Sequence, residues 1–328
     1  MSKCDVRIEL TDNKKTYVQG DTVNGKVYLS VDKDVKCNDL KLSLRWYTHG
    51  MGNRDQGEVA CESLFKGDLK PGEYSYDFSL KLDKSNPTYH GHYVNIDWIV
   101  HAQVDIPWAL DPKAQHDISV KRINETKKTS DIIVDMSPKT CGGSIFAMVF
   151  MVIFGSVFAI GGSSADGGGI IFSIIGLGII ILGLYTGLYK MVRNKMASKK
   201  LGNIEANLSK GVFHPGDSAK LNLKFQPQES IQLNGIKATL KGSEIAVSGS
   251  GSDRTTHTHD FLVKDFNIES SRTLSARSPV NHSIDIIIPD DAPQTFSSFN
   301  NKIKWLVSLE IDIDKWPDWA TEKDIRVI

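Results

Sequence analysis

The chain has 328 residues, a length that favours two domains of about 100 to 200 residues each. Lysine plus arginine and aspartate plus glutamate both number 39, so the formal net charge is zero and no basic excess marks a nucleic-acid-binding protein. The four cysteines lack metal-ligand spacing and are expected to be reduced thiols. The first nine residues contain no apolar run, so we expect no cleavable secretory signal.

Residues 1–124 are predicted to form an antiparallel β-sandwich. Apolar and polar residues alternate along 40–46 and along 74–82, and this period of two indicates half-buried strands. Turn residues separate the runs, as in Gly20-Asp21 and Pro71-Gly72. Many short strands with regular turns favour an immunoglobulin-like sandwich, although the Cys…Trp…Cys spacing of a true immunoglobulin domain is absent.

Residues 125–142 are predicted to be a basic linker, and residues 143–192 a hairpin of two transmembrane helices. Residues 143–162 carry no charge, and a second uncharged run covers 167–189. Each run is about 20 residues long, which as a helix spans a hydrocarbon core of roughly 30 Å. We therefore expect helices over 143–162 and 168–190, with a buried helical pair as the alternative. Small residues on the second helix would let the helix backbones approach closely: Gly176, Gly183 and Gly187.

The charges around the hairpin predict its orientation. The short connecting loop holds one acid, Asp166, and no lysine or arginine, whereas basic residues lie on both outer flanks. The positive-inside rule then places both flanks in the cytoplasm. The expected localisation is an integral membrane protein with two spans and both sandwiches on the cytoplasmic side.

Residues 201–328 repeat the pattern of the first unit. Residues 17–44 match 213–240 at a constant displacement of 196 positions, and residues 96–118 match 303–325 at a displacement of 207. Trp98 and Trp305 occupy the same place in the two copies, which for tryptophan indicates a core position. The two gap-free blocks indicate an internal duplication with one loop insertion, and a second sandwich.

Three stretches of the first unit resemble a known family. They are the Tyr-x-x-Gly-Asp-x-Val-x-Gly-x-Val run at 17–27, the Leu-x-Leu-x-Leu strand at 40–44 and the segment YHGHYVNIDWIVHAQVDI at 89–106. Together they resemble the arrestin N-terminal domain, particularly its α-arrestin and retromer-subunit-like relatives, and the second unit resembles the arrestin C-terminal domain. The resemblance implies all-β tandem sandwiches that bind protein partners. The chain departs from the family in its helical hairpin, in having no Pro-Pro motif, and in the single basic residue Arg7 where phosphate-sensing members carry adjacent lysines.

Histidine pairs are the only candidates for metal chemistry. His90 and His92 stand two positions apart, as do His257 and His259, so in a strand each pair lies on one face and could chelate zinc or copper. A solvated strand edge is the alternative. We predict no metal site and name His257 and His259 only as candidates, because no third or fourth ligand is identifiable. We predict no catalytic residue and no cofactor.

The predicted function is a membrane-anchored, cytoplasm-facing scaffold or adaptor that binds protein partners without catalysis. The flexible composition of the 248–254 loop makes it a candidate recognition loop, with a plain mobile loop as the alternative. Its candidate binding residues are Ser248, Ser250, Ser252 and Arg254. The alternative function is a structural subunit of a membrane or envelope complex, assembled as a homo- or hetero-oligomer through the glycines of the hairpin.

Overall fold

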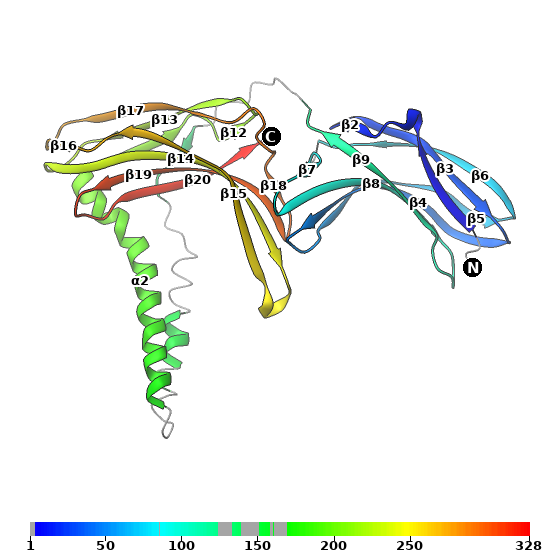
Figure 1. The fold of residues 1–328 in the computed structure, drawn as a ribbon, viewed down its shortest axis with the longest axis horizontal. Coiled ribbons are helices and arrows are strands. Elements are labelled where there is room, and N and C mark those ends of the chain that lie inside the picture. The colour runs from blue at the N-terminus through cyan, green and yellow to red at the C-terminus, as the bar shows by residue number, and fades with distance from the viewer. Residues whose placement is uncertain (1–3, 85, 124–132, 139–150, 158–159, 161–168) are drawn as a thin grey trace.

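The computed structural model describes residues 4–84, 86–123, 133–138, 151–157, 160 and 169–328. These residues form two β-sandwiches that lie end to end, with a long helix extending from the second (Figure 1). Strands dominate because alternating sequence runs bury every second side chain; the burial of Cys4–Leu10, for example, alternates strictly.

The N-terminal sandwich consists of two sheets. One sheet has the order β1 (Cys4–Leu10), β3 (Thr22–Val31), β6 (Gly72–Lys81). The other has the order β2 (Thr16–Val18), β9 (Lys113–Lys121), β8 (Val94–Asp105), β4 (Val35–Gly50), β5 (Gln56–Leu69), with β7 (Tyr89–His90) paired to β8. All pairings are antiparallel except that of β2 with β9. A short 3-10 turn, Thr11–Asn13, precedes β2.

The C-terminal sandwich repeats these strand orders and adds two strands, β10 and β16. Its smaller sheet is β10 (Val134–Asp135), β11 (Ile204–Leu208), β13 (Ser218–Phe225), β17 (Val280–Ile287). Its larger sheet is β12 (Val212–Phe213), β20 (Trp319–Val327), β19 (Asn301–Ile313), β14 (Ile231–Ser248), β15 (Thr255–Glu269), with β16 (Arg272–Leu274) on β14 and β18 (Phe296–Ser297) on β19. A 3-10 turn, Gly251–Asp253, lies between β14 and β15. The parallel pair of β12 with β20 repeats that of β2 with β9.

Individual hydrogen bonds also repeat between the two sandwiches. Trp98 Nε1 donates to the carbonyl of Asn86 at 3.0 Å, and Trp305 Nε1 donates to that of Pro293 at 2.9 Å. The backbone N–H of Val18 donates to Asp21 at 3.0 Å, and the equivalent His214 donates to Asp217 at 2.9 Å. The repeated sequence pattern therefore corresponds to a repeated strand order and to repeated side-chain roles.

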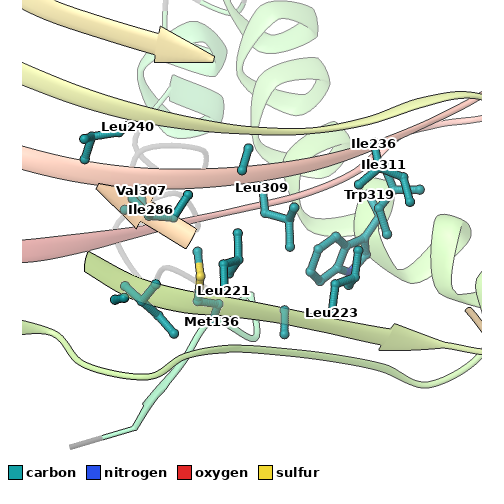
Figure 2. Packing of buried hydrophobic residues seen from close by; sticks show 14 of the residues in the cluster. Met136, Leu221, Leu223, Ile236, Leu240, Ile286, Val307, Leu309, Ile311 and Trp319 are labelled. Carbon is teal, nitrogen blue, oxygen red and sulfur yellow. The ribbon is translucent and has the colours of Figure 1, made fainter. Parts of the chain in front are cut away.

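Each sandwich has its own hydrophobic core between its two sheets. In the C-terminal sandwich, side chains from both sheets and from the segment before the helix interdigitate (Figure 2). Trp319, 2% exposed, lies beside Leu223 and Ile311 in this view. Each core also contains a buried tryptophan on the equivalent strand, Trp98 on β8 and Trp305 on β19. Its large apolar surface is removed from water while its N–H keeps a carbonyl partner. The period-two pattern thus produces two separate hydrophobic cores, one in each sandwich.

The helix α2 (Gly169–Leu201) is built into the C-terminal sandwich at its C-terminal end. Ala197 and Leu201 are fully buried in the sandwich core. Toward its other end, a Cβ on Gly155, in the helical residues 151–157, would come within 2.7 Å of the Gly176 carbonyl oxygen, so this piece lies closely against α2. Gly183 and Gly187 lie within α2.

The predicted transmembrane hairpin is corrected by the structure. Among the described residues, no helix is both long and apolar enough to cross a membrane. The predicted span 168–190 falls within α2 from residue 169 onward, and α2 continues through a basic segment into the sandwich core rather than ending at residue 190. Most of the predicted span 143–162 lies outside the described residues, as does the linker except 133–138.

The fold class and the localisation change with this finding. The expectation of two sandwiches plus a two-helix transmembrane hairpin is wrong, and what the described residues show is a mostly β chain with several sheets and a long helix docked on the second sandwich. The expected localisation as a two-span integral membrane protein with cytoplasmic sandwiches depended on those spans, so it is wrong as well. An uncharged run of suitable length was insufficient because the sequence pattern does not report how far a helix continues.

Candidate functional site

The junction between the two sandwiches holds most of the buried polar residues in the described part of the chain. It is centred on a small apolar cluster shared by both sandwiches, in which Val94 and Ile96 of the first meet Ala246, Phe296 and Ile303 of the second. The ring of Trp46 from β4 packs edge-on against Phe296 with centroids 5.5 Å apart. This apolar centre excludes water from the polar groups around it, which strengthens their hydrogen bonds.

The first polar group is the Glu244 cluster, formed by Glu244 of β14 and residues 89–94 of the N-terminal sandwich. Glu244 is 1% exposed, and its Oε1 accepts hydrogen bonds from the Tyr89 hydroxyl at 2.6 Å and from the N–H of His92 at 3.1 Å. Its Oε2 accepts the N–H groups of Tyr93 at 2.5 Å and Val94 at 3.0 Å. Consecutive backbone N–H groups in a turn form a concave anion-binding site, and here the anion is a carboxylate of the other sandwich.

Glycine is required inside the Glu244 cluster. A Cβ at Gly91 would collide with the Glu244 carboxylate and would also meet the Tyr89 ring. The turn after β7 can therefore close around the carboxylate only because residue 91 has no side chain.

The second polar group is the Asp55 cluster, formed by the turn before β5 and residues 298–301 of the C-terminal sandwich. Asp55 Oδ2 accepts hydrogen bonds from Ser298 Oγ at 2.5 Å, the N–H of Asn300 at 2.8 Å and Asn301 Nδ2 at 2.9 Å. Its Oδ1 accepts Asn300 Nδ2 at 2.8 Å. Asn301 is fully buried and also donates to Thr48 Oγ1 at 2.9 Å.

The two clusters are related by the internal duplication. Thr48 pairs with Ile96 in the first sandwich, as Glu244 pairs with Ile303 in the second, so Thr48 and Glu244 are equivalent. In each case a carboxylate of one sandwich satisfies the turn that leads into the long central strand of the other. The junction is therefore reciprocal, and each sandwich holds a turn of its neighbour.

Further contacts extend the junction on both sides. Asn53 and Gly249 occupy equivalent hairpin tips and join each other, with Asn53 Nδ2 donating to the Gly249 carbonyl at 2.7 Å and the Gly249 N–H donating back at 3.2 Å. Gln19 Nε2 donates to Gln294 Oε1 at 3.2 Å, and Arg122 donates to the Ala292 carbonyl at 3.2 Å. The sandwiches are thus joined at several separated places, which restricts hinge motion.

Histidines line the exposed rim of the junction. The ring of His92 lies against that of His259 with centroids 4.3 Å apart, and Tyr93 contacts His259 with centroids 5.7 Å apart. On the first sandwich, the two carboxylate oxygens of Asp97 are hydrogen-bonded to His49 Nε2 at 2.7 Å and to His90 Nε2 at 2.8 Å. The structure therefore brings one member of each sequence-identified histidine pair together across the junction.

Each carboxylate cluster shifts the pKa of one of its groups, Asp55 in one and Tyr89 in the other. Burial opposes the charged form of Asp55, but the hydrogen bonds from Ser298, Asn301 and Asn300 outweigh it and lower the pKa of Asp55. Burial and the hydrogen bond to Glu244 raise the pKa of the Tyr89 hydroxyl well above its ordinary value. Asp55 is therefore held as an anion and Tyr89 as a neutral donor.

Apart from His259, which contacts His92, the predicted metal and loop residues have their partners within the C-terminal sandwich. His257 Nε2 lies 3.0 Å from Ser248 Oγ, and within the described part of the chain no group of three or more histidine, cysteine, aspartate or glutamate residues could hold a metal ion. Ser250 accepts the N–H of Asp253 at 3.1 Å through its carbonyl, and Ser252 Oγ donates to Asp253 at 3.3 Å. The Arg254 guanidinium lies 5.0 Å from the centroid of the exposed Phe299 ring.

Sequence reasoning missed Glu244, Asp55 and Asn301. A signal was present for one of them, because Glu244 is a charged residue within a run of inward-facing strand residues, where burial of an unpaired carboxylate would be costly. Asp55 stands in the turn before β5 and Asn301 at the first residue of β19, directly after a turn, where such residues are ordinary, so nothing in the local sequence marked them.

Comparison with known proteins adds little to these observations. No family model and no curated protein matches the chain. Among solved structures, the chain is similar to Spo0M, a sporulation control protein from Bacillus subtilis, at 17% identity and a TM-score of 0.31. The match covers 38% of this chain and 48% of that one, which is less than half of either.

Proposed function

We propose that the chain is a non-catalytic adaptor that presents two β-sandwiches to protein partners in one fixed relative orientation. The observation that carries this proposal is the reciprocal junction, in which Glu244 and Asp55 each bind a turn of the opposite sandwich. Both oxygens of each carboxylate accept hydrogen bonds from the opposite sandwich, and this structural role supports a non-catalytic protein.

Rigidity is the advantage of such a junction for a binding protein. Separating the sandwiches would exchange these hydrogen bonds for bonds to water and would expose the apolar cluster shared by both sandwiches, so the net contributions of the two together favour the joined arrangement. A partner that contacts both sandwiches then meets a surface already ordered, and the entropic cost of binding falls. The balanced net charge supports protein rather than nucleic-acid partners.

The finer assignment within this proposal is that the sandwiches are arrestin-like. What supports it is the motif resemblance at 17–27, 40–44 and 89–106, together with a tandem of two sandwiches in which the strand order of the first recurs in the second. In this view strand edges and loops receive the partner, and main-chain hydrogen bonds supply part of the affinity.

Proximity labelling with the full chain tests the proposal. The wild-type chain should enrich a reproducible set of proteins, and a Glu244→Gln/Asp55→Asn double variant should retain folded sandwiches but enrich the same set less strongly. The exposed substitution Asp285→Asn serves as the matched control and should leave the set unchanged. If the wild-type chain enriches no specific protein, the adaptor proposal fails.

A further inference from the structure

The two sandwiches carry the same turn at their outer ends, away from the junction (Figure 1). We call residues 106–111, between β8 and β9, the N-terminal outer turn, and residues 313–318, between β19 and β20, the C-terminal outer turn. Asp111 accepts the N–H of Ile106 at 3.2 Å, and the equivalent Asp318 accepts that of Ile313 at 3.3 Å. The two outer turns are therefore closed by the same internal hydrogen bond.

The C-terminal outer turn is covered by α2. Trp316 Nε1 donates to the Met196 carbonyl at 3.0 Å, and Lys200 Nζ lies 4.3 Å from the centre of the Trp316 ring. Asn194 bridges the open edge of β20, donating to the Ala320 carbonyl at 2.9 Å and accepting its N–H at 3.0 Å. The helix α2 thus covers the turn at Trp316 and supplies hydrogen-bond partners to the edge of β20 at Ala320.

The N-terminal outer turn carries its large apolar side chains at other positions, because Ala109 stands at the place of Trp316 and Trp108 at the place of the exposed Lys315. Trp108 is 105% exposed and Leu110 is 94% exposed, so no described residue shields either side chain. Lys113 is the equivalent of Ala320, and β2 pairs with β9 only over Ser119, Val120 and Lys121, so the described strands leave the first half of this edge open. An exposed apolar tip therefore stands next to a strand edge that, in the other sandwich, a residue of α2 closes.

The backbone conformation of Trp108 is a second reason to interpret the exposed N-terminal outer turn as a binding site. Trp108 has φ of +59°, in the left-handed region that bulky residues avoid, and its equivalent Lys315 has φ of +54°. A strained tryptophan that is also fully hydrated gains nothing within the free chain, and such outliers concentrate at binding sites.

Charge indicates the kind of helix that would fit. Burial raises the pKa of Asp318, and Arg193 of α2 opposes that rise, so a basic helix residue lies near this carboxylate. At the N-terminal end, Asp111 is half-buried, and Asp39 and Asp105 are directly opposed across β4 and β8. Lys66, 3.6 Å from Asp39, offsets only part of this negative charge.

We propose that the N-terminal outer turn and the adjoining edge of β9 form a docking site for a basic amphipathic α-helix of a partner protein. The apolar stripe of that helix covers Trp108 and Leu110, and an arginine or lysine approaches Asp111. This inference rests on the proposed adaptor function and names one of its surfaces. A second copy of this chain does not supply the helix through the matching part of α2, because Asn194, Ala197 and Leu201 are already engaged in their own sandwich.

The test uses a labelled, helix-stapled peptide with the sequence of residues 190–201, titrated into the full chain and followed by fluorescence anisotropy. A Trp108→Ser/Leu110→Ser variant should bind it about tenfold more weakly or worse, because a central tryptophan usually dominates such contacts. Val263→Ser, which removes another exposed apolar side chain, is the matched control and should leave affinity unchanged. A peptide with Arg193→Glu and Lys200→Glu should also bind more weakly.

Three results would overturn the inference. They are failure of the helical peptide to bind, binding that the Trp108→Ser/Leu110→Ser variant does not weaken, and stronger Trp108-dependent binding of an extended strand peptide or of phosphatidylcholine/phosphatidylserine vesicles. Proximity labelling separates this outcome from failure of the adaptor proposal. If the outer-turn variant still enriches the wild-type set of proteins, the adaptor role stands and only this docking site is refuted.

Discussion

Glu244→Gln is the most direct test of the junction, because it changes one buried oxygen to an amide group and leaves the shape intact. The carboxylate accepts four hydrogen bonds, from the Tyr89 hydroxyl and from the N–H groups of His92, Tyr93 and Val94. A glutamine will keep its oxygen toward Tyr93 and Val94. Its amide then faces Tyr89, whose hydroxyl can rotate to accept, and His92, whose N–H cannot.

The expected cost follows from these partners. One N–H loses its acceptor, which costs about 1–3 kcal/mol in a buried site, and the remaining bonds lose their charge assistance. We expect the free energy of opening the Glu244 cluster to fall by about 2–4 kcal/mol in total. At 1.36 kcal/mol per factor of ten, amide hydrogen exchange at Tyr93 and Val94 should accelerate by about 30- to 900-fold.

Hydrogen–deuterium exchange with peptide-level resolution measures this effect. Exchange within the separate cores, for example at Trp98 and Trp305, should change much less, since those residues keep their partners. The Asp285→Asn control should alter neither region. If the Tyr93 and Val94 amides exchange within about threefold of the wild-type rate in a folded Glu244→Gln variant, the carboxylate does not hold this turn and the reasoning is wrong.

Three other changes have defined outcomes. Because the pKa of Asp55 is lowered in the folded chain, its contribution to stability is present above its unfolded value of about 4 and is lost as the pH falls through the lower folded value. The free energy of unfolding measured in urea should therefore fall as the pH is lowered from 5 to 2.5, and Asp55→Asn should weaken this dependence on pH. An unchanged dependence would contradict the reasoning. Gly91→Ala should expel the Glu244 carboxylate and lower the midpoint of thermal unfolding at least as far as Glu244→Gln, whereas an equal midpoint to wild type would show that the turn adapts. Asn194→Ala removes both hydrogen bonds to Ala320 and should destabilise the C-terminal sandwich by about 1–3 kcal/mol in urea unfolding, with no effect on exchange in the N-terminal sandwich.

The strand pattern of the chain was predictable because it is a local property. Alternation along 40–46 requires only that every second side chain be buried, and the strand β4 has its residues Leu40, Leu42 and Leu44 in the core as that pattern indicates. The recurrence of Trp98 and Trp305 predicted a core position in both copies, and both side chains are 1% exposed.

The helical segment shows where local reasoning fails. Uncharged residues over 167–189 define a composition, but the end of a helix and its partners depend on tertiary packing. Asn194 reaches Ala320, 126 positions away, and Leu201 enters the sandwich core. These contacts belong to the fold of the second unit, and no count of apolar residues could reveal them.

The sequence by itself determined the two sandwiches, because period-two burial and a repeated pattern act over short distances and recur in each copy. Only the tertiary structure decided how the sandwiches join. Glu244 meets Val94 across 150 positions, and Asp55 meets Asn300 across 245. A carboxylate and a turn look ordinary in sequence. Their role appears only when folding removes both from water and leaves each as the other's hydrogen-bond partner.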